Sequence, residues 1–168
     1  MAGMKPLHVV VMGVAGCGKS LAGALLAQRL QLPLVEGDDF HPAANIEKMR
    51  LAVALTDADR AGWLERLAGE LRRHPEGAVL TCSALKRSYR DTLRAAAPGL
   101  RFVHLALTQH QALDRVASRT DHFYPPSLVA SQFEALEDPA GEAGVHVADG
   151  TAHVQRLVET AARWLARA

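Results

Sequence analysis

The chain has few of the features that mark secreted, membrane-spanning or nucleic-acid-binding proteins. It contains only two cysteines among 168 residues, Cys17 and Cys82, and their spacing matches no zinc pattern. The net charge of +1 favours neither a nucleic-acid partner nor an anionic membrane surface. No apolar run approaches the ~20 residues of a membrane helix, and no secretory signal or transit peptide is visible. These absences predict a cytoplasmic protein with reduced thiols.

What the chain does contain is a single domain, residues 1–168, in which strand-like and helix-like segments alternate. This alternation predicts a three-layer α/β/α sandwich around a mainly parallel five-stranded sheet. Ser127 is the expected N-cap of one of the helices. The expected strands are 7–12, 34–36, 78–82, 101–107 and 145–148, and the expected helices are 19–30, 42–50, 57–73, 86–97, 109–119, 127–136 and 151–167.

A glycine-rich segment between the first expected strand and helix carries the strongest chemical signal. It matches the G-x-x-x-x-G-K-S/T pattern of a P-loop, whose glycines let backbone N–H groups point at phosphate oxygens. We expect Lys19 to contact the β- and γ-phosphates of ATP and the Ser20 hydroxyl to bind Mg²⁺. The whole segment is predicted to bind the nucleotide, and it reads Gly13-Val14-Ala15-Gly16-Cys17-Gly18-Lys19-Ser20.

Acidic residues that could complete this site follow the second expected strand. The third strand, 78–82, ends without the carboxylate that motor and transport ATPases carry there, and no Asn-Lys-x-Asp guanine-binding motif occurs. Because parallel strands end at one sheet edge, Glu36 and Asp38 should lie beside the P-loop. We expect Asp38 to orient or deprotonate an acceptor hydroxyl and Glu36 to hold the hydration shell of Mg²⁺. Asp39 is expected to be a turn residue.

Polar residues after these acids indicate a hydroxylated or anionic acceptor. His41, Asn45 and Lys48 offer hydrogen-bond donors and a cation, although a solvated helix face contains such residues as well. The pattern leaves open a kinase for another small acid, a polyol or a nucleotide. It also leaves open a protein that binds ATP as a conformational signal, although the acid at position 38 favours catalysis.

Longer strings in the chain resemble the gluconate kinase family. The resemblance runs in order from about Val9 to Asp149 and implies a P-loop kinase of the nucleoside-monophosphate-kinase type, similar to shikimate kinase. It implies transfer of phosphate from ATP to the 6-hydroxyl of D-gluconate, and a homodimer. The strings include Gly37-Asp38, His41-Pro42, Asn45-Ile46-Glu47-Lys48-Met49, Asp59-Arg60, Cys82-Ser83-Ala84-Leu85-Lys86, Tyr89-Arg90-Asp91 and Ser131-Gln132-Phe133.

The resemblance also implies roles for several cations. Lys86 and Arg90 would face the carboxylate of gluconate, in addition to the acceptor-binding groups that the polar pattern predicts at His41 and Lys48. A lid over about 119–127 would bring Arg119 to the transferring phosphate. Arg115, one helical turn earlier, would pack on the adenine. Solvated helix faces would explain the same arginines and lysines.

The chain departs from the family pattern at two places. The family commonly has a Gly-x-Pro-Leu turn where this chain reads Ala52-Val53-Ala54-Leu55. Loss of glycine and proline predicts a more helical connection there. Asp121 replaces the usual glycine before the lid histidine, His122. Both departures are expected to affect acceptor binding and to leave the transfer chemistry intact.

Overall fold

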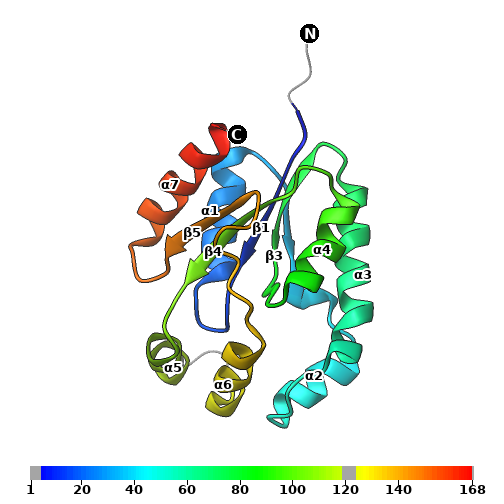
Figure 1. The fold of residues 1–168 in the computed structure, drawn as a ribbon, viewed down its shortest axis with the longest axis vertical. Coiled ribbons are helices and arrows are strands. Elements are labelled where there is room, and N and C mark those ends of the chain that lie inside the picture. The colour runs from blue at the N-terminus through cyan, green and yellow to red at the C-terminus, as the bar shows by residue number, and fades with distance from the viewer. Residues whose placement is uncertain (1–4, 119–123, 168) are drawn as a thin grey trace.

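The computed structural model describes residues 5–118 and 124–167. Within them, five parallel strands form one sheet in the order β2-β3-β1-β4-β5 (Figure 1). The predicted parallel five-stranded sheet is therefore confirmed. The strands are β1 Leu7–Met12, β2 Leu34–Glu36, β3 Gly77–Thr81, β4 Arg101–Ala106 and β5 Val145–Asp149.

Helices cover both faces of this sheet and one of its ends. Figure 1 shows α1 and α7 on one face and α3 and α4 on the other, which confirms the three layers. Helices α2, α5 and α6 lie beyond the ends of the strands (Figure 1). None of the described helices is long and apolar enough to cross a membrane. The helices are α1 Lys19–Leu30, α2 Ala43–Arg50, α3 Asp57–Arg73, α4 Arg87–Ala96, α5 Gln109–Ser118, α6 Pro126–Ala135 and α7 Val154–Ala166, with a 3₁₀ turn η1 at Gly37–Phe40.

The central strand β1 separates two hydrophobic clusters. Val10 and Met12 point into the cluster under α3 and α4, whereas Val9 and Val11 point into the cluster under α1 and α7. All four side chains are buried. A strand covered on both faces needs apolar residues at every position, which explains why β1 reads as a continuous apolar run.

The start of α6 differs from the prediction. The helix begins at Pro126 with Pro125 as its N-cap, so Ser127 lies inside the first turn and is not the cap. Proline suits the first helical position because its fixed φ is helical and its missing N–H would have no partner there.

The connection after α2 also differs from the prediction, since it is not helical. Ala52 has a left-handed φ of +60°. Its N–H donates to the carbonyl of Met49 (3.1 Å), and the N–H of Val53 donates to the carbonyl of Lys48 (2.8 Å). These two bonds form a Schellman motif, in which the left-handed residue is usually glycine. Helix α2 therefore ends in a left-handed C-cap that has alanine where glycine is usual.

We expect Ala52→Gly to raise the free energy of unfolding by about 1 kcal/mol, because glycine adopts the left-handed conformation without a Cβ clash. Urea denaturation of the two proteins measures the difference. Ala61→Gly is a matched control at an exposed position inside α3. It should have the opposite sign, lowering the free energy of unfolding by about 1 kcal/mol. A loss of stability in both variants would contradict the prediction.

Candidate active site

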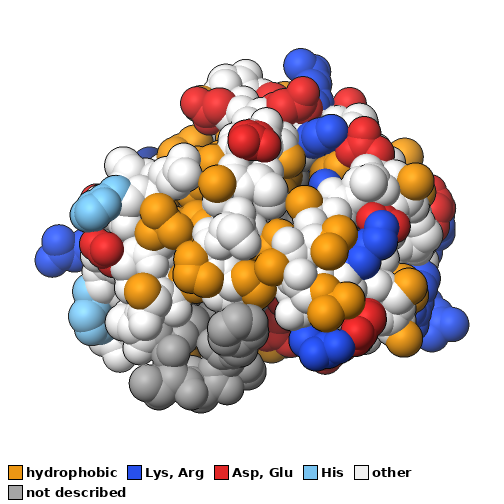
Figure 2. Space-filling model, turned by 90° about the horizontal axis from the view of Figure 1, so that it is seen from below, with side chains coloured by type: hydrophobic (Ala, Val, Ile, Leu, Met, Phe, Trp, Pro, Cys, Tyr) orange, Lys and Arg blue, Asp and Glu red, His pale blue; other side chains and the backbone are white. Residues whose placement is uncertain are grey.

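A cavity of about 950 Å³ opens at the end of the sheet where the strands terminate. Its walls come from the P-loop, the end of β2, and helices α2, α3 and α6. Figure 2 looks onto this end of the molecule, where hydrophobic side chains are spread across the face. Open α/β sheets bind ligands at this edge, so the cavity is the candidate active site.

The P-loop forms one wall of the cavity. Gly18 is the N-cap of α1 and has a left-handed φ of +90°, which favours glycine. The ammonium group of Lys19 donates to the carbonyls of Gly13 (3.0 Å) and Val14 (3.2 Å). Cys17 is buried behind the loop, and its thiol is free like that of Cys82. The P-loop residues that line the cavity are Ala15, Gly16, Gly18, Lys19 and Ser20.

A carboxylate and two hydroxyls meet beside the P-loop. Glu36 Oε2 accepts hydrogen bonds from Ser20 Oγ (3.2 Å) and from Thr81 Oγ1 (2.7 Å). Thr81 ends β3, where the sequence shows no acid, and the sequence analysis did not single it out. A hydroxyl and a carboxylate provide oxygen ligands suitable for Mg²⁺, which is usually bound by one or two protein groups together with phosphates and waters. Ser20 and Glu36 therefore fit the predicted metal site.

Asp38 lies at the mouth of the same cavity. A Cβ on Gly37 would come within 2.1 Å of the Thr81 carbonyl, so only glycine lets η1 pass this close to β3. The chain then turns Asp38 outward, and its side chain is 81% exposed. Its carboxylate lies 4.0 Å from Nε2 of His41. Asp38 is therefore accessible to an acceptor hydroxyl in the cavity that the P-loop also lines.

His41 is a buried histidine held in one orientation. Its ring stacks on Trp63 with centroids 4.1 Å apart, and the side-chain amide of Asn45 lies 3.2 Å from Nδ1. Burial lowers the pKa of His41, although the nearby Asp38 opposes that shift. With Asn45 donating to Nδ1, the neutral ring carries its proton on Nε2, facing Asp38. Trp63 is buried, lines the cavity and donates to the Gly37 carbonyl (2.8 Å).

Arg60 is a cation that the sequence analysis did not assign to the site. It lines the cavity although only 8% of it is exposed. Among the described residues its guanidinium makes one hydrogen bond, to the Tyr89 hydroxyl (3.2 Å). A buried cation needs an anionic partner. Arg60 lies one turn before Trp63 and therefore on the apolar face of α3. A charged residue on an apolar helix face is the sequence signal that could have identified Arg60 as a site residue.

Helix α6 and the two residues before it, Tyr124 and Pro125, form the wall opposite α2. Tyr124 and Leu128 line the cavity there. Burial, together with the charge of Asp38, raises the pKa of Tyr124 to about 12, so its hydroxyl remains a donor. Gln132, also on this wall, accepts a hydrogen bond from the Ala15 N–H at 2.6 Å.

No protein-family model matches the chain. The gluconokinase of Gluconobacter oxydans is 45% identical over 160 residues, which cover 94% of this chain and 90% of that protein. The crystal structure of a gluconokinase from Sinorhizobium meliloti is 44% identical, with a TM-score of 0.90, and the match covers 97% of this chain and 93% of that one. The chain belongs to the gluconokinase family.

A solved structure of much lower sequence identity has a similar fold. Shikimate kinase from Aquifex aeolicus has a TM-score of 0.64 over 95% of this chain and 96% of that one, at 15% identity. At that identity the likeness concerns the fold alone. The predicted resemblance to gluconate kinases and the predicted P-loop kinase fold are both confirmed.

Two lysines that are predicted to bind the acceptor, Lys48 from the polar pattern and Lys86 from the resemblance, have other partners in this structure. Lys48 pairs with Asp59 (2.7 Å), and Lys86 pairs with Asp57 (2.9 Å). Neither lysine lines the cavity. Their contacts with gluconate stay predictions.

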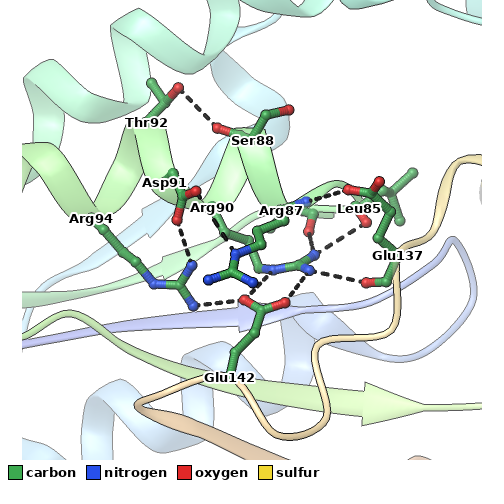
Figure 3. A network of polar contacts seen from close by, with 10 residues as sticks. Leu85, Arg87, Ser88, Arg90, Asp91, Thr92, Arg94, Glu137 and Glu142 are labelled. Atoms are coloured by element: carbon green, nitrogen blue, oxygen red, sulfur yellow. Dashed lines mark hydrogen bonds and ion pairs between the residues drawn. The ribbon is translucent and has the colours of Figure 1, made fainter.

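Arg90 is placed differently from the gluconokinase-based expectation. Its side chain is fully buried, and its guanidinium is held by the Glu142 carboxylate (2.5 Å) and by the carbonyls of Ala84, Leu85 and Glu137 (Figure 3). A guanidinium has five donors, and this network uses them inside the protein. We therefore correct the expected gluconate contact of Arg90 to a structural role.

Arg115 contacts two backbone carbonyls of the P-loop. Its Nη1 donates to the carbonyls of Gly16 (3.4 Å) and Cys17 (3.3 Å), and its Nη2 donates to that of Gly150 (2.6 Å). It lines the cavity, and its packing on adenine stays a prediction. Arg119, with Asp121, His122 and the first part of the expected lid, lies outside the described residues.

Proposed function

We propose that this member of the gluconokinase family transfers the terminal phosphate of ATP to the 6-hydroxyl of D-gluconate. One observation carries the proposal: the P-loop, an accessible carboxylate and a buried arginine all face one cavity. The P-loop can bind a nucleoside triphosphate, Asp38 can accept a hydrogen bond from a hydroxyl, and Arg60 can pair with a carboxylate. A gluconate molecule has the two groups required on the acceptor side.

The proposed transfer is a direct displacement. The acceptor oxygen forms a bond to the γ-phosphorus, the bond from that phosphorus to the bridging oxygen breaks, and ADP leaves. The hydroxyl proton passes to Asp38, while Lys19 and the P-loop amides stabilise charge on the phosphate oxygens. Mg²⁺, held by the Ser20 hydroxyl and by Glu36, would neutralise phosphate charge. Thr81 holds Glu36 in place through its hydroxyl.

Acceptor recognition combines one cation with neutral donors. We propose that Arg60 binds the carboxylate of gluconate, where it would replace a weak hydrogen bond to a tyrosine with a charged one. The Nε2–H of His41 and the hydroxyl of Tyr124 are available to the hydroxyl groups of the acceptor. Gluconate would thus be held by its carboxylate with its far hydroxyl toward Asp38.

A coupled assay of ADP release tests the proposed activity. The panel contains gluconate, shikimate, other sugar acids, neutral polyols and nucleoside monophosphates with Mg·ATP. We expect a gluconate-dependent rate far above the others. Turnover of a different acceptor would support kinase activity and show that the acceptor is not gluconate. If no acceptor supported ADP release although the protein bound ATP, the result would favour a protein that binds ATP as a conformational signal.

Arg60→Met should raise the KM for gluconate by about 10- to 10²-fold, the value of a charged hydrogen bond, and change turnover of a neutral polyol much less. Methionine fills similar space without the charge. Lys86→Met is the matched control, because Lys86 pairs with Asp57 outside the cavity. If Lys86→Met selectively weakened gluconate and Arg60→Met did not, the carboxylate would bind at Lys86.

A homodimer and a cytoplasmic location are further parts of the proposal. They rest on the resemblance to gluconate kinases and on the composition of the chain. Light scattering of the purified protein measures the molecular mass, and a mass of one chain would rule out the homodimer.

A further inference from the structure

A glutamine from the wall opposite α2 contacts the P-loop directly. Oε1 of Gln132 accepts a hydrogen bond from the backbone N–H of Ala15 at 2.6 Å, although 117 positions separate the two residues. Both residues line the cavity. The backbone N–H groups of a P-loop are donors for phosphate oxygens. Gln132 therefore places an oxygen of the protein against a donor of the phosphate-binding loop.

This contact fixes which way the side-chain amide of Gln132 points. A backbone N–H can only donate, so the atom that faces Ala15 must be the oxygen. The NH₂ group then lies on the other side of the planar amide, with two donors. Gln132 is half-buried and lines the cavity together with the P-loop, so its NH₂ group is within the site and is not committed to Ala15.

The position of Gln132 matches the path of the transferred phosphate. Its helix α6 follows Tyr124, which lines the cavity together with Asp38 and Arg60 on the acceptor side. Gln132 itself is bound to the P-loop on the donor side. During transfer the γ-phosphate must lie between the P-loop and Asp38. Tyr124 and Gln132 both line the cavity that contains the P-loop and Asp38, and the Gln132 side chain of α6 is bonded to the loop.

We propose that Gln132 is a further catalytic residue, whose NH₂ group donates a hydrogen bond to an oxygen of the γ-phosphate while Ala15 holds its Oε1. The inference rests on the proposed function, because it assumes that ATP binds at the P-loop. Charge that develops on the transferring oxygens strengthens such a bond in the transition state. ADP lacks the γ-phosphate, so the contact distinguishes ATP from ADP.

Gln132→Glu tests the NH₂ group alone. Glutamate has the same length and can still accept from the Ala15 N–H, but its second oxygen repels the γ-phosphate. We expect turnover to fall about 10²-fold. We also expect the affinity for ATP to fall at least about tenfold, while the affinity for ADP changes by less than about threefold. Competition with a fluorescent ADP analogue measures both affinities. If the Gln132→Glu variant kept wild-type turnover, the residue would only tie α6 to the loop and the proposal would fail.

Gln132→Ala is the second variant, because it removes both hydrogen-bonding groups without adding charge. Here too ATP affinity should fall more than ADP affinity, whereas equal losses would mean a purely structural role and would overturn the proposal. Glu134→Ala, at an exposed position of the same helix, is the matched control and should leave both affinities unchanged. Nucleotide binding needs no acceptor, so this readout remains valid if the wild-type protein fails to phosphorylate gluconate.

Discussion

Asp38→Asn should lower the turnover of gluconate by at least about 10²-fold while the affinity for ATP stays nearly unchanged. Asp38 follows β2, its side chain is 81% exposed, and it lines the same cavity as the P-loop. Asparagine has the same shape and can still orient a hydroxyl, but it cannot take the proton. Its effect therefore separates proton transfer from orientation.

Steady-state kinetics with gluconate and equilibrium binding of ATP measure the two quantities. Asp39→Asn is the control, because Asp39 lies on the same 3₁₀ turn and has the same charge and shape. It should change turnover by less than about threefold. Equal turnover of Asp38→Asn and the wild type would remove Asp38 from the mechanism. A loss of only a few fold would indicate that Asp38 orients the hydroxyl and that the proton leaves late.

Arg90→Met should lower the free energy of unfolding by about 3–5 kcal/mol, the usual loss when one partner of a buried ion pair is removed. The Arg90 side chain is 0% exposed, and Glu142 bridges it to Arg94 (Figure 3). Removing Arg90 leaves Glu142 with one cation and leaves the Ala84 and Leu85 carbonyls without their partner. The network joins α4 to the segment after α6, so its loss should weaken the fold as a whole.

Urea denaturation measures this loss, and Arg87→Met is the matched control on the same helix. The Arg87 side chain is 69% exposed and lies 4.0 Å from Asp91, a surface pair. Its removal should change the free energy of unfolding by less than about 1 kcal/mol. Similar stability of the two variants would contradict the structural role of Arg90. In that case its predicted contact with gluconate would be considered again.

The same network predicts that the free energy of unfolding depends on pH. Burial of the Glu142 carboxylate opposes its ionisation, but hydrogen bonds from Arg90 and Arg94 outweigh burial and hold its pKa below the ordinary 4.5. A lowered pKa in the folded state stabilises the protein above the unfolded pKa, and this contribution is lost as the pH falls through the folded pKa. Between about pH 6 and about pH 3 the wild type should therefore lose more stability than Glu142→Gln. If the free energy of unfolding changed with pH in the same way for the wild type and for Glu142→Gln, the contribution of Glu142 would be excluded.

The sequence by itself determined the features that depend on neighbouring residues. The P-loop is a continuous string whose glycines and lysine act through local backbone geometry, and its helix begins at the predicted residue, Lys19. The apolar run of β1 and the 3.6-residue period of α3 likewise predicted their elements, because burial of a face follows from spacing alone. The acids after β2 could be placed beside the P-loop because parallel strands end together.

Only the tertiary structure decided which long side chains reach the cavity. Lys86 and Arg90 follow β3 as the pattern required, yet Asp57 and Glu142 hold them elsewhere, and Arg60 is the buried cation that lines the cavity. A flexible cationic side chain extends toward the strongest partner within reach, and the partners of Lys86 and Arg90 lie 29 and 52 positions away along the chain. The Gln132–Ala15 bond depends on such long-range placement, since spacing predicts the face of a helix and not what packs against it.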